Sequence, residues 1–304
     1  MPPLVCAQSA ARSIRLCMSA FQRQLWMRIE DYDPVSQFSE LHALVVEMVD
    51  APGGAPIPAG MAWMADRQTL SKKFAHHLHT LAEIHCGSVL MVGGVGVPFI
   101  DHGSIKVIAR AVLENFIVFA QVFGDPDAEV CRFRHMTWKL GGLMDRQSLS
   151  ASTAESKSRL AAEKLQIDQL SAELKANAMY QTLTNGTQKA ILKGDWKTGR
   201  SWQALAKEAG LSEAYFRNIY SYLCGYSHSS YAAAMQVGQA NDLAEQSSLS
   251  SSMFGVMCLC MARFATLYAA LFPSARTVLE RERRPAFDMW NIGATRMEEV
   301  YASR

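Results

Sequence analysis

Two charged side chains stand close together in a segment that is otherwise apolar. Between positions 107 and 123 the only charged residues are Arg110 and Glu114, four positions apart. On a helix they lie one turn apart on the same face, where they can form an ion pair. A lone charge is costly to bury, so the two either neutralise each other or meet a partner. The pattern predicts a structural ion pair or, alternatively, a functional polar pocket.

A second polar set occupies a tyrosine-rich segment further along the chain. Arg217, Ser221, Cys224 and His228 follow one another at helical spacing and share a face, with Tyr220 beside them. His228 is the member of this set that exchanges a proton most readily near neutral pH. The spacing is compatible with a general acid/base or with a structural histidine at a helix end.

The same segment has the outline of a helix-turn-helix motif. Residues 202–210 and 211–223 are typical of two helices joined by a turn at Gly210. The second helix carries one cation, Arg217, and one acid, Glu213, among large apolar residues that need burial. A net charge of +2 also gives little attraction to a phosphate backbone. DNA reading is therefore the least favoured function.

Positive charge is concentrated between Cys131 and Lys139. Arg134 and His135 are the residues of this cluster that we expect to bind a phosphate group or an acidic partner. The alternative is a solvated helix face. No phosphate-binding loop accompanies the cluster, because the glycines at 93–96 lack the lysine of a P-loop.

Histidines gather between positions 76 and 85. His76 and His79 share a helix face, which amounts to half of a metal site. The segment lacks the Glu-x-x-His pattern that would supply the remaining ligands. We therefore expect a solvated helix face, with no metal and no other cofactor.

Helices must position all of these groups, because apolar residues recur at three- and four-residue spacing in every long segment. The predicted fold is all-α, a multi-helix bundle with mostly antiparallel helices. Loops are expected at 52–58 and 93–98, and residues 87–100 leave open a short strand. The predicted helices span 8–29, 37–49, 66–92, 104–123, 127–147, 153–183, 186–193, 201–209, 212–228, 241–272 and 287–300.

We expect three parts along the chain: a helical extension at 1–65, a core at 66–240, and C-terminal helices at 241–304 that pack on that core. The long helix at 153–183 has an apolar face that falls short of four heptads, which argues against a long coiled coil. It is expected to form an arm of the bundle or a dimerisation surface. A homodimer is therefore one expected assembly.

Composition excludes several classes of protein. Of the 304 residues, 49% are hydrophobic and 19% are charged, which excludes disordered, collagen-like and strongly basic nucleic-acid-coating proteins. The seven cysteines are scattered without a CxxC pair, which indicates free thiols in a reducing compartment. We expect a cytoplasmic protein.

Two segments bear on targeting and membranes. We expect no secretory signal at the N-terminus, and the arginines before Glu30 fit either a transit peptide or an amphipathic first helix. Residues 253–272 are long and apolar enough to cross a bilayer. Arg263 at their midpoint favours a buried core helix instead, so no membrane span is expected.

The order of these motifs resembles the mostly bacterial domain of unknown function 5677 family. Its members carry an Arg-x-x-x-Glu helix, a W-S-x-K-S stretch, an A-x-x-x-G-L segment and a Tyr-Arg-x-x-Ser-x-x-x-His ending. The resemblance covers roughly residues 70–240 and implies an all-α fold without an established activity. The matching positions here are Arg110 and Glu114, residues 196–201, residues 206–211, and then Tyr220, Ser221, Cys224 and His228.

The family's arginine-to-histidine spacing is similar to that of the HEPN group of helical ribonucleases, which occur in bacterial toxin and phage-defence systems. In that group, Arg and His act together on the RNA backbone. Ser221 stands here where that arginine would be, and Arg217 lies one turn earlier. Arg110 or Arg134 would have to replace it in space, or a second protomer would have to complete the site.

Two hypotheses from different classes follow. The first is an intracellular helical binding or effector protein with a role in stress or phage defence, whose buried Arg/Glu/His site is structural or receives an unknown ligand or protein partner. The second is a HEPN-like, metal-independent ribonuclease that acts on RNA. In the second, His228, Arg110 and Glu114 are the expected catalytic residues, and the expected binding residues are Arg217, Tyr220, Arg134 and His135.

Overall fold

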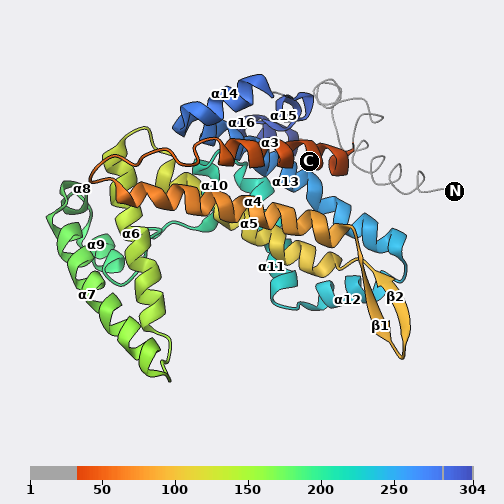
Figure 1. Ribbon diagram of the computed structural model, residues 1–304, viewed down its shortest axis with the longest axis horizontal. Helices are drawn as coiled ribbons and strands as arrows, with labels where there is room; N and C mark the ends of the chain where they lie inside the picture. The colour runs from red at the N-terminus through yellow and green to blue at the C-terminus, as the bar shows by residue number, and fades with distance from the viewer. Residues whose placement is uncertain (1–32, 283, 303–304) are drawn as a thin grey trace.

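The computed structural model describes residues 33–282 and 284–302, and it confirms a mostly helical fold (Figure 1). The predicted helix at 8–29 lies outside the described residues. One short antiparallel hairpin, β1 (Ser88–Val92) and β2 (Val95–Phe99), accompanies the helices. In chain order the α-helices are α3 (Pro34–Asp50), α4 (Ala65–His85), α5 (His102–Phe123), α6 (Ala128–Gln147), α7 (Ala154–Ala176), α8 (Ala178–Gln181), α9 (Asn185–Ile191), α10 (Trp202–Glu208), α11 (Glu213–Ser227), α12 (Tyr231–Gln239), α13 (Leu243–Leu271), α14 (Pro273–Arg281), α15 (Pro285–Trp290) and α16 (Ala294–Ala302).

The helix predicted at 66–92 is wrong beyond residue 85, where the chain turns into β1. Gly87 follows the end of α4 with a φ of +87°, a conformation that few residues other than glycine adopt. Gly93 and Gly94 both have positive φ and connect β1 to β2 in a two-residue turn. The open alternative of a strand within 87–100 is therefore the correct one.

Other differences lie at helix ends. The helix predicted at 153–183 is interrupted at Asn177, whose extended backbone ends α7 and whose side chain caps α8. The helix predicted at 287–300 is likewise two helices, α15 and α16. Two further helices, α12 and α14, were not predicted from the sequence. They begin at the Ser230 cap and at Pro273, which are both common helix-start signals.

The main core lies between α3, α4, α5 and α13, and the first three of these helices run side by side in Figure 1. Phe264 of α13 stacks on Phe74 of α4 with ring centroids 4.3 Å apart, and it contacts Phe119 of α5 at 5.2 Å. All three rings are fully buried. Each large apolar side chain removed from water in this way contributes about 1.5–3 kcal/mol. The apolar residues whose spacing predicts the helices therefore also pack these helices against one another.

Helix α13 is long and apolar enough to cross a membrane by length and composition, and within this fold most of its apolar window is buried by other helices. Its Arg263 donates to Asn291 Oδ1 at 3.2 Å. The same guanidinium lies against Gly210, which has a φ of +84° and follows the end of α10. Gly210 thus fits both the turn before α11 and the close approach of Arg263.

A second, smaller apolar cluster lies in helices α6 to α9, which extend from the main body at the lower left of Figure 1. Leu140 of α6 and Leu174 of α7 are fully buried there. The long helix α7 is therefore part of an arm with its own packing. Helix α13, from the expected C-terminal part, lies in the main core together with α4 and α5.

The β1–β2 hairpin projects from the opposite end of the molecule, at the lower right of Figure 1. Six of its apolar side chains, on both faces, are exposed, from 45% at Val97 to 66% at Met91. Pro98 stands opposite Val89 and has no N–H, which weakens β2 as a pairing edge and leaves β1 as the more complete one. The hairpin is thus the largest exposed apolar element among the described residues.

Candidate functional site

Arg110 and Glu114 form the predicted ion pair on α5, and Tyr220 of α11 completes it. Arg110 Nε donates to Glu114 Oε1 at 2.9 Å. The Tyr220 hydroxyl donates to the same carboxylate oxygen at 2.7 Å and accepts from Arg110 Nη2 at 3.3 Å. The three polar groups therefore satisfy one another in a closed triangle, which we call the α5–α11 clasp. The clasp joins two helices that are about 100 residues apart in sequence.

Aromatic side chains hold Tyr220 in place. Its ring stacks on Phe216 at 5.1 Å and lies 6.2 Å from Trp202 of α10. The Arg110 guanidinium carbon lies 5.2 Å from the centre of the same ring, within the range of a cation–π contact. The clasp is thus packed on three helices, α5, α10 and α11.

Solvent still reaches the clasp, since the side chains of Arg110 and Glu114 are 22% and 29% exposed. Burial, followed by the hydrogen bond to Glu114, raises the pKa of Tyr220 to about 12, so its hydroxyl stays protonated at neutral pH. Burial lowers the pKa of Arg110, but the bond with Tyr220 and the charge of Glu114 outweigh it and raise that pKa. Neither Arg110 nor Tyr220 therefore exchanges a proton easily near pH 7.

His228 lies outside the clasp. It is exposed at the C-terminal end of α11, where its backbone N–H donates to Cys224 O. Its imidazole makes no hydrogen bond or ion pair with the residues that the structure describes. Of the three expected catalytic residues, the structure brings Arg110 and Glu114 together, but not His228. Tyr220 contacts the ion pair instead.

Arg217 is exposed on α11, and its nearest ionic partner is Glu213, with Arg217 Nη2 3.7 Å from Glu213 Oε1. Glu213 also faces Lys207 at 3.9 Å. Pairs at such distances and exposures contribute little to stability. Within the described chain, no arginine forms a polar contact with the His228 ring, so the predicted arginine–histidine pair of a HEPN-like site is not assembled in one protomer.

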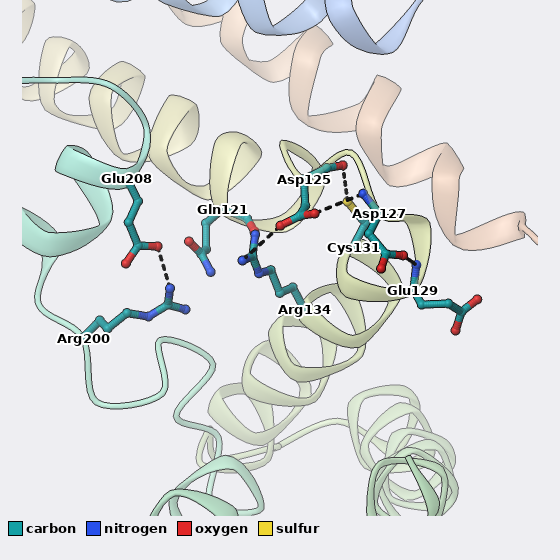
Figure 2. A network of polar contacts seen from close by, with 8 residues as sticks. All are labelled: Gln121, Asp125, Asp127, Glu129, Cys131, Arg134, Arg200 and Glu208. Carbon is teal, nitrogen blue, oxygen red and sulfur yellow. Dashed lines mark hydrogen bonds and ion pairs between the residues drawn. The ribbon is translucent and has the colours of Figure 1, made fainter. Parts of the chain in front are cut away.

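Arg134 lies in a separate network at the junction of α5 and α6 (Figure 2). Its guanidinium contacts Asp125 Oδ2 at 3.4 Å and donates to the Gln121 carbonyl at 3.2 Å. On the other side of Gln121, Arg200 pairs with Glu208 at 2.6 Å. The Gln121 amide, turned with its oxygen toward Arg200, connects that pair through bonds of 2.6–3.1 Å. Arg134 and Arg200 are therefore each already paired with a carboxylate within the fold.

His135 is buried, whereas the sequence favoured a place in an exposed basic cluster. Its Nε2 lies 2.7 Å from Asp66 Oδ2 of α4, and its ring packs near Trp63, Phe123 and Trp138. Burial lowers the pKa of His135 and outweighs the opposing effect of Asp66. The residue links α6 to α4 and is not available to an external phosphate.

Sequence reasoning overlooked Lys106, which precedes Arg110 by one turn and has no solvent exposure. Its Nζ contacts three acceptors: the His102 carbonyl at 3.3 Å, His102 Nδ1 at 3.2 Å and the Leu249 carbonyl at 3.1 Å. It also lies 4.6 Å from the centre of the Tyr226 ring. Burial lowers its pKa to about 8. The sequence contains one indication of this unusual lysine: Lys106 lies in an apolar helix and has no acid three or four positions away.

The histidines at 76 and 79 line a pocket of about 800 Å³ between α3, α4 and the loop that joins them. No group of three or more potential metal ligands occurs among the described residues. His79 instead stacks on His42 of α3 at 5.9 Å. Arg67 of α4, which the sequence did not single out, lies in the same pocket. Like Lys106, it has no acid three or four positions away on its helix.

Comparison with known proteins gives a family and no characterised relative. No curated protein and no solved structure matches the chain. The sequence model of a family of unknown function matches residues 88–246, close to the range expected from the motifs. The match covers more than half of the chain and includes both helices of the α5–α11 clasp. The chain therefore belongs to the family of unknown function DUF5677.

Proposed function

We propose that the protein is an intracellular helical binding module without hydrolytic activity of its own. The observation that carries this proposal is the closure of the α5–α11 clasp, in which two nitrogens of Arg110, one carboxylate oxygen of Glu114 and the Tyr220 hydroxyl bond to one another. A general acid/base has to exchange protons with a substrate near the working pH. The raised pKa values of Arg110 and Tyr220 keep these two groups protonated at that pH, and the His228 ring makes no described contact with the clasp.

In this proposal the clasp is a structural element. It fixes the register of α11 against α5, as a partly buried ion pair with a hydrogen-bonded third member can do. Fixing that register holds the aromatic residues Phe216 and Trp202 against the main body. The ligand or partner then binds elsewhere on the surface. An effector role in stress or phage defence is part of the proposal and follows from the family resemblance alone.

The HEPN-like ribonuclease is the second candidate. The exposure of His228 is the observation in its favour, since an unpartnered imidazole at a helix end is accessible to RNA. The arginine of such a site would have to come from another protomer. A composite site of this kind requires a homodimer that brings a basic residue to the end of α11.

A homodimer is also part of the proposal, and the β1–β2 hairpin is the surface that supports it. The free edge of β1 and the exposed side chains of Leu90 and Met91 suit pairing with a second copy. Light scattering of the wild type should give twice the monomer mass. Met91→Lys should give the monomer mass, and a wild-type monomer at high concentration would contradict this part of the proposal.

The activity test compares the wild type with His228→Ala in bacteria, and uses Lys73→Ala as an exposed residue away from α11 and outside the pocket between α3 and α4. We expect all three strains to grow equally and to keep intact ribosomal RNA. The purified proteins should also leave a mixed RNA substrate uncut without added metal. RNA cleavage by the wild type and by Lys73→Ala, but not by His228→Ala, would contradict the proposal and establish the ribonuclease.

A further inference from the structure

The pocket between α3 and α4 is large enough for a small molecule. Its volume of about 800 Å³ lies within the range of small-molecule sites. Val46 and Val49 of α3 form one wall, and Ile57 and Met64 lie on the connecting segment. Phe272, at the end of α13, contributes an aromatic surface. Most of the wall is therefore apolar.

Arg67 is the distinctive polar group of this pocket. It is half-buried, and burial lowers its pKa. Its guanidinium carbon lies 5.1 Å from the centre of the Phe272 ring, and its buried Nε has no hydrogen-bond partner. The neighbouring carboxylate of Asp66 is engaged by His135. Among the described residues, Arg67 is thus a partly desolvated cation without a carboxylate partner, in contrast to the paired arginines of the clasp and of Figure 2.

The other charged groups of the pocket are mostly basic. Lys72, His76 and His79 lie on α4 along the same wall as Arg67, and Asp50 is the one acid in the lining. The ring of His42 stacks on His79, and His42 Nε2 is buried without a partner. The pocket therefore combines apolar walls with an excess of positive or protonatable groups over negative ones.

We propose that this pocket binds a small soluble anion that carries a phosphate or carboxylate group on a short apolar body. The planar guanidinium of Arg67 is suited to bidentate contact with either acidic group, and the ring of Phe272 keeps it in position. Lys72 adds positive charge at the rim. The apolar body of the ligand packs on Val49 and Met64. This inference rests on the proposed function, because it names the ligand class of the binding module.

Isothermal titration calorimetry of the full chain with octyl phosphate tests the assignment. We expect the wild type to bind, Arg67→Gln to bind at least tenfold more weakly, and Lys72→Gln to bind a few-fold more weakly. Lys73→Gln is the matched control, since Lys73 is exposed on the same helix but does not line the pocket. It should bind like the wild type. Circular dichroism of each variant verifies that it is folded.

Three further probes define the ligand class. Octanoate should bind, inorganic phosphate should bind at least tenfold more weakly than octyl phosphate, and octylamine should not bind. Absence of octyl phosphate binding at millimolar concentration, or equal affinity of the wild type and folded Arg67→Gln, would overturn the assignment. Sedimentation with phosphatidic acid vesicles in the absence of octyl phosphate binding would overturn it in favour of a membrane lipid.

The two proposals fail in different ways. If neither anionic amphiphile binds and wild-type RNA stays intact, the ligand assignment is wrong and the binding module stands. If the wild type cleaves RNA through His228, the module proposal is wrong whatever the pocket binds.

Discussion

Arg110 and Arg67 are both partly buried arginines on helices of the main core, and they have opposite surroundings. Arg110 meets Glu114 at 2.9 Å and Tyr220 at 3.3 Å, so its charge is compensated within the fold. Arg67 lies against the ring of Phe272 and lines a pocket, and it contacts no carboxylate in the part of the chain that the structure describes. The first arrangement stabilises the contact of two helices, while the second leaves a cation that is suited to an anion from outside.

The comparison shows that the position of a charge in sequence does not reveal its role. The pair at 110 and 114 stands out because it lies four positions apart in an apolar helix, yet that spacing is what allows it to be satisfied locally. Arg67 is inconspicuous in a polar helix. Its isolation becomes evident only when α3, α4 and Phe272 surround it.

The largest expected effect concerns Lys106, a buried cation held by carbonyl oxygens instead of a carboxylate. The pKa of Lys106 is about 8 in the folded protein, whereas the ordinary value for a lysine is 10.5. Between these values the unfolded chain holds a proton that the folded chain has lost, so the free energy of unfolding rises with pH across this window. Relative to Lys106→Met, the wild type should gain about 2 kcal/mol between pH 7.5 and 9.5.

Urea denaturation at several pH values measures this effect, and the difference between the two proteins cancels the tyrosines and cysteines that also titrate. Parallel pH profiles for the wild type and Lys106→Met would contradict the assignment of a lowered pKa to Lys106.

The second prediction breaks the clasp. Glu114→Ala removes the acceptor of both Arg110 and Tyr220 and leaves the guanidinium half-buried without its counter-ion. We expect the free energy of unfolding to fall by about 1–2 kcal/mol, a range that allows for the partial exposure of the pair. Chemical denaturation at pH 7 gives the value. An unchanged midpoint would show that the clasp contributes nothing to stability.

The third prediction removes one hydroxyl. Tyr220→Phe keeps the ring that packs on Phe216 and loses the bond to Glu114. The expected loss is about 1 kcal/mol, smaller than for Glu114→Ala because the ion pair persists. In the double variant the two losses should be less than additive, since both remove the same hydrogen bond. Strict additivity would argue that Tyr220 and Glu114 act independently.

The smallest stability effect belongs to Arg67. Arg67→Gln removes a partly desolvated charge that has no ionic partner within residues 33–282 and 284–302, and it also removes a contact with the Phe272 ring. Because these effects oppose each other, we expect the free energy of unfolding to change by less than about 1 kcal/mol. A thermal melt at pH 7 measures it. A loss larger than that of Glu114→Ala would assign Arg67 to the structure instead of the ligand.

Several features of the fold follow from the sequence for identifiable reasons. The all-α class and the helix at 104–123 are predicted from regular apolar spacing, and the burial of residues 253–272 from the cost of placing Arg263 in lipid. The end of α4 does not follow from the apolar pattern, because Val89 to Val92 continue the apolar run and the left-handed backbone at Gly87 becomes evident only in the structure.

The candidate site was only partly predictable. Spacing correctly paired Arg110 with Glu114, and the family motifs linked the α5 segment to the one that holds Tyr220. Periodicity does not tell whether Tyr220 or His228 meets this pair, because it gives the face of a helix and not which part of its length is covered by another helix. The surroundings of Lys106 and Arg67 depend on contacts with α13 and α3, which are distant in sequence.

The most direct test measures octyl phosphate affinity and unfolding free energy on the same preparations of two variants. Arg67→Gln should lose at least tenfold in affinity while its stability stays close to that of the wild type. Glu114→Ala should lose stability while it retains wild-type affinity under conditions where it is folded. The reverse pattern, or parallel losses of both properties in both variants, would contradict the division between a compensated structural arginine and an uncompensated binding one.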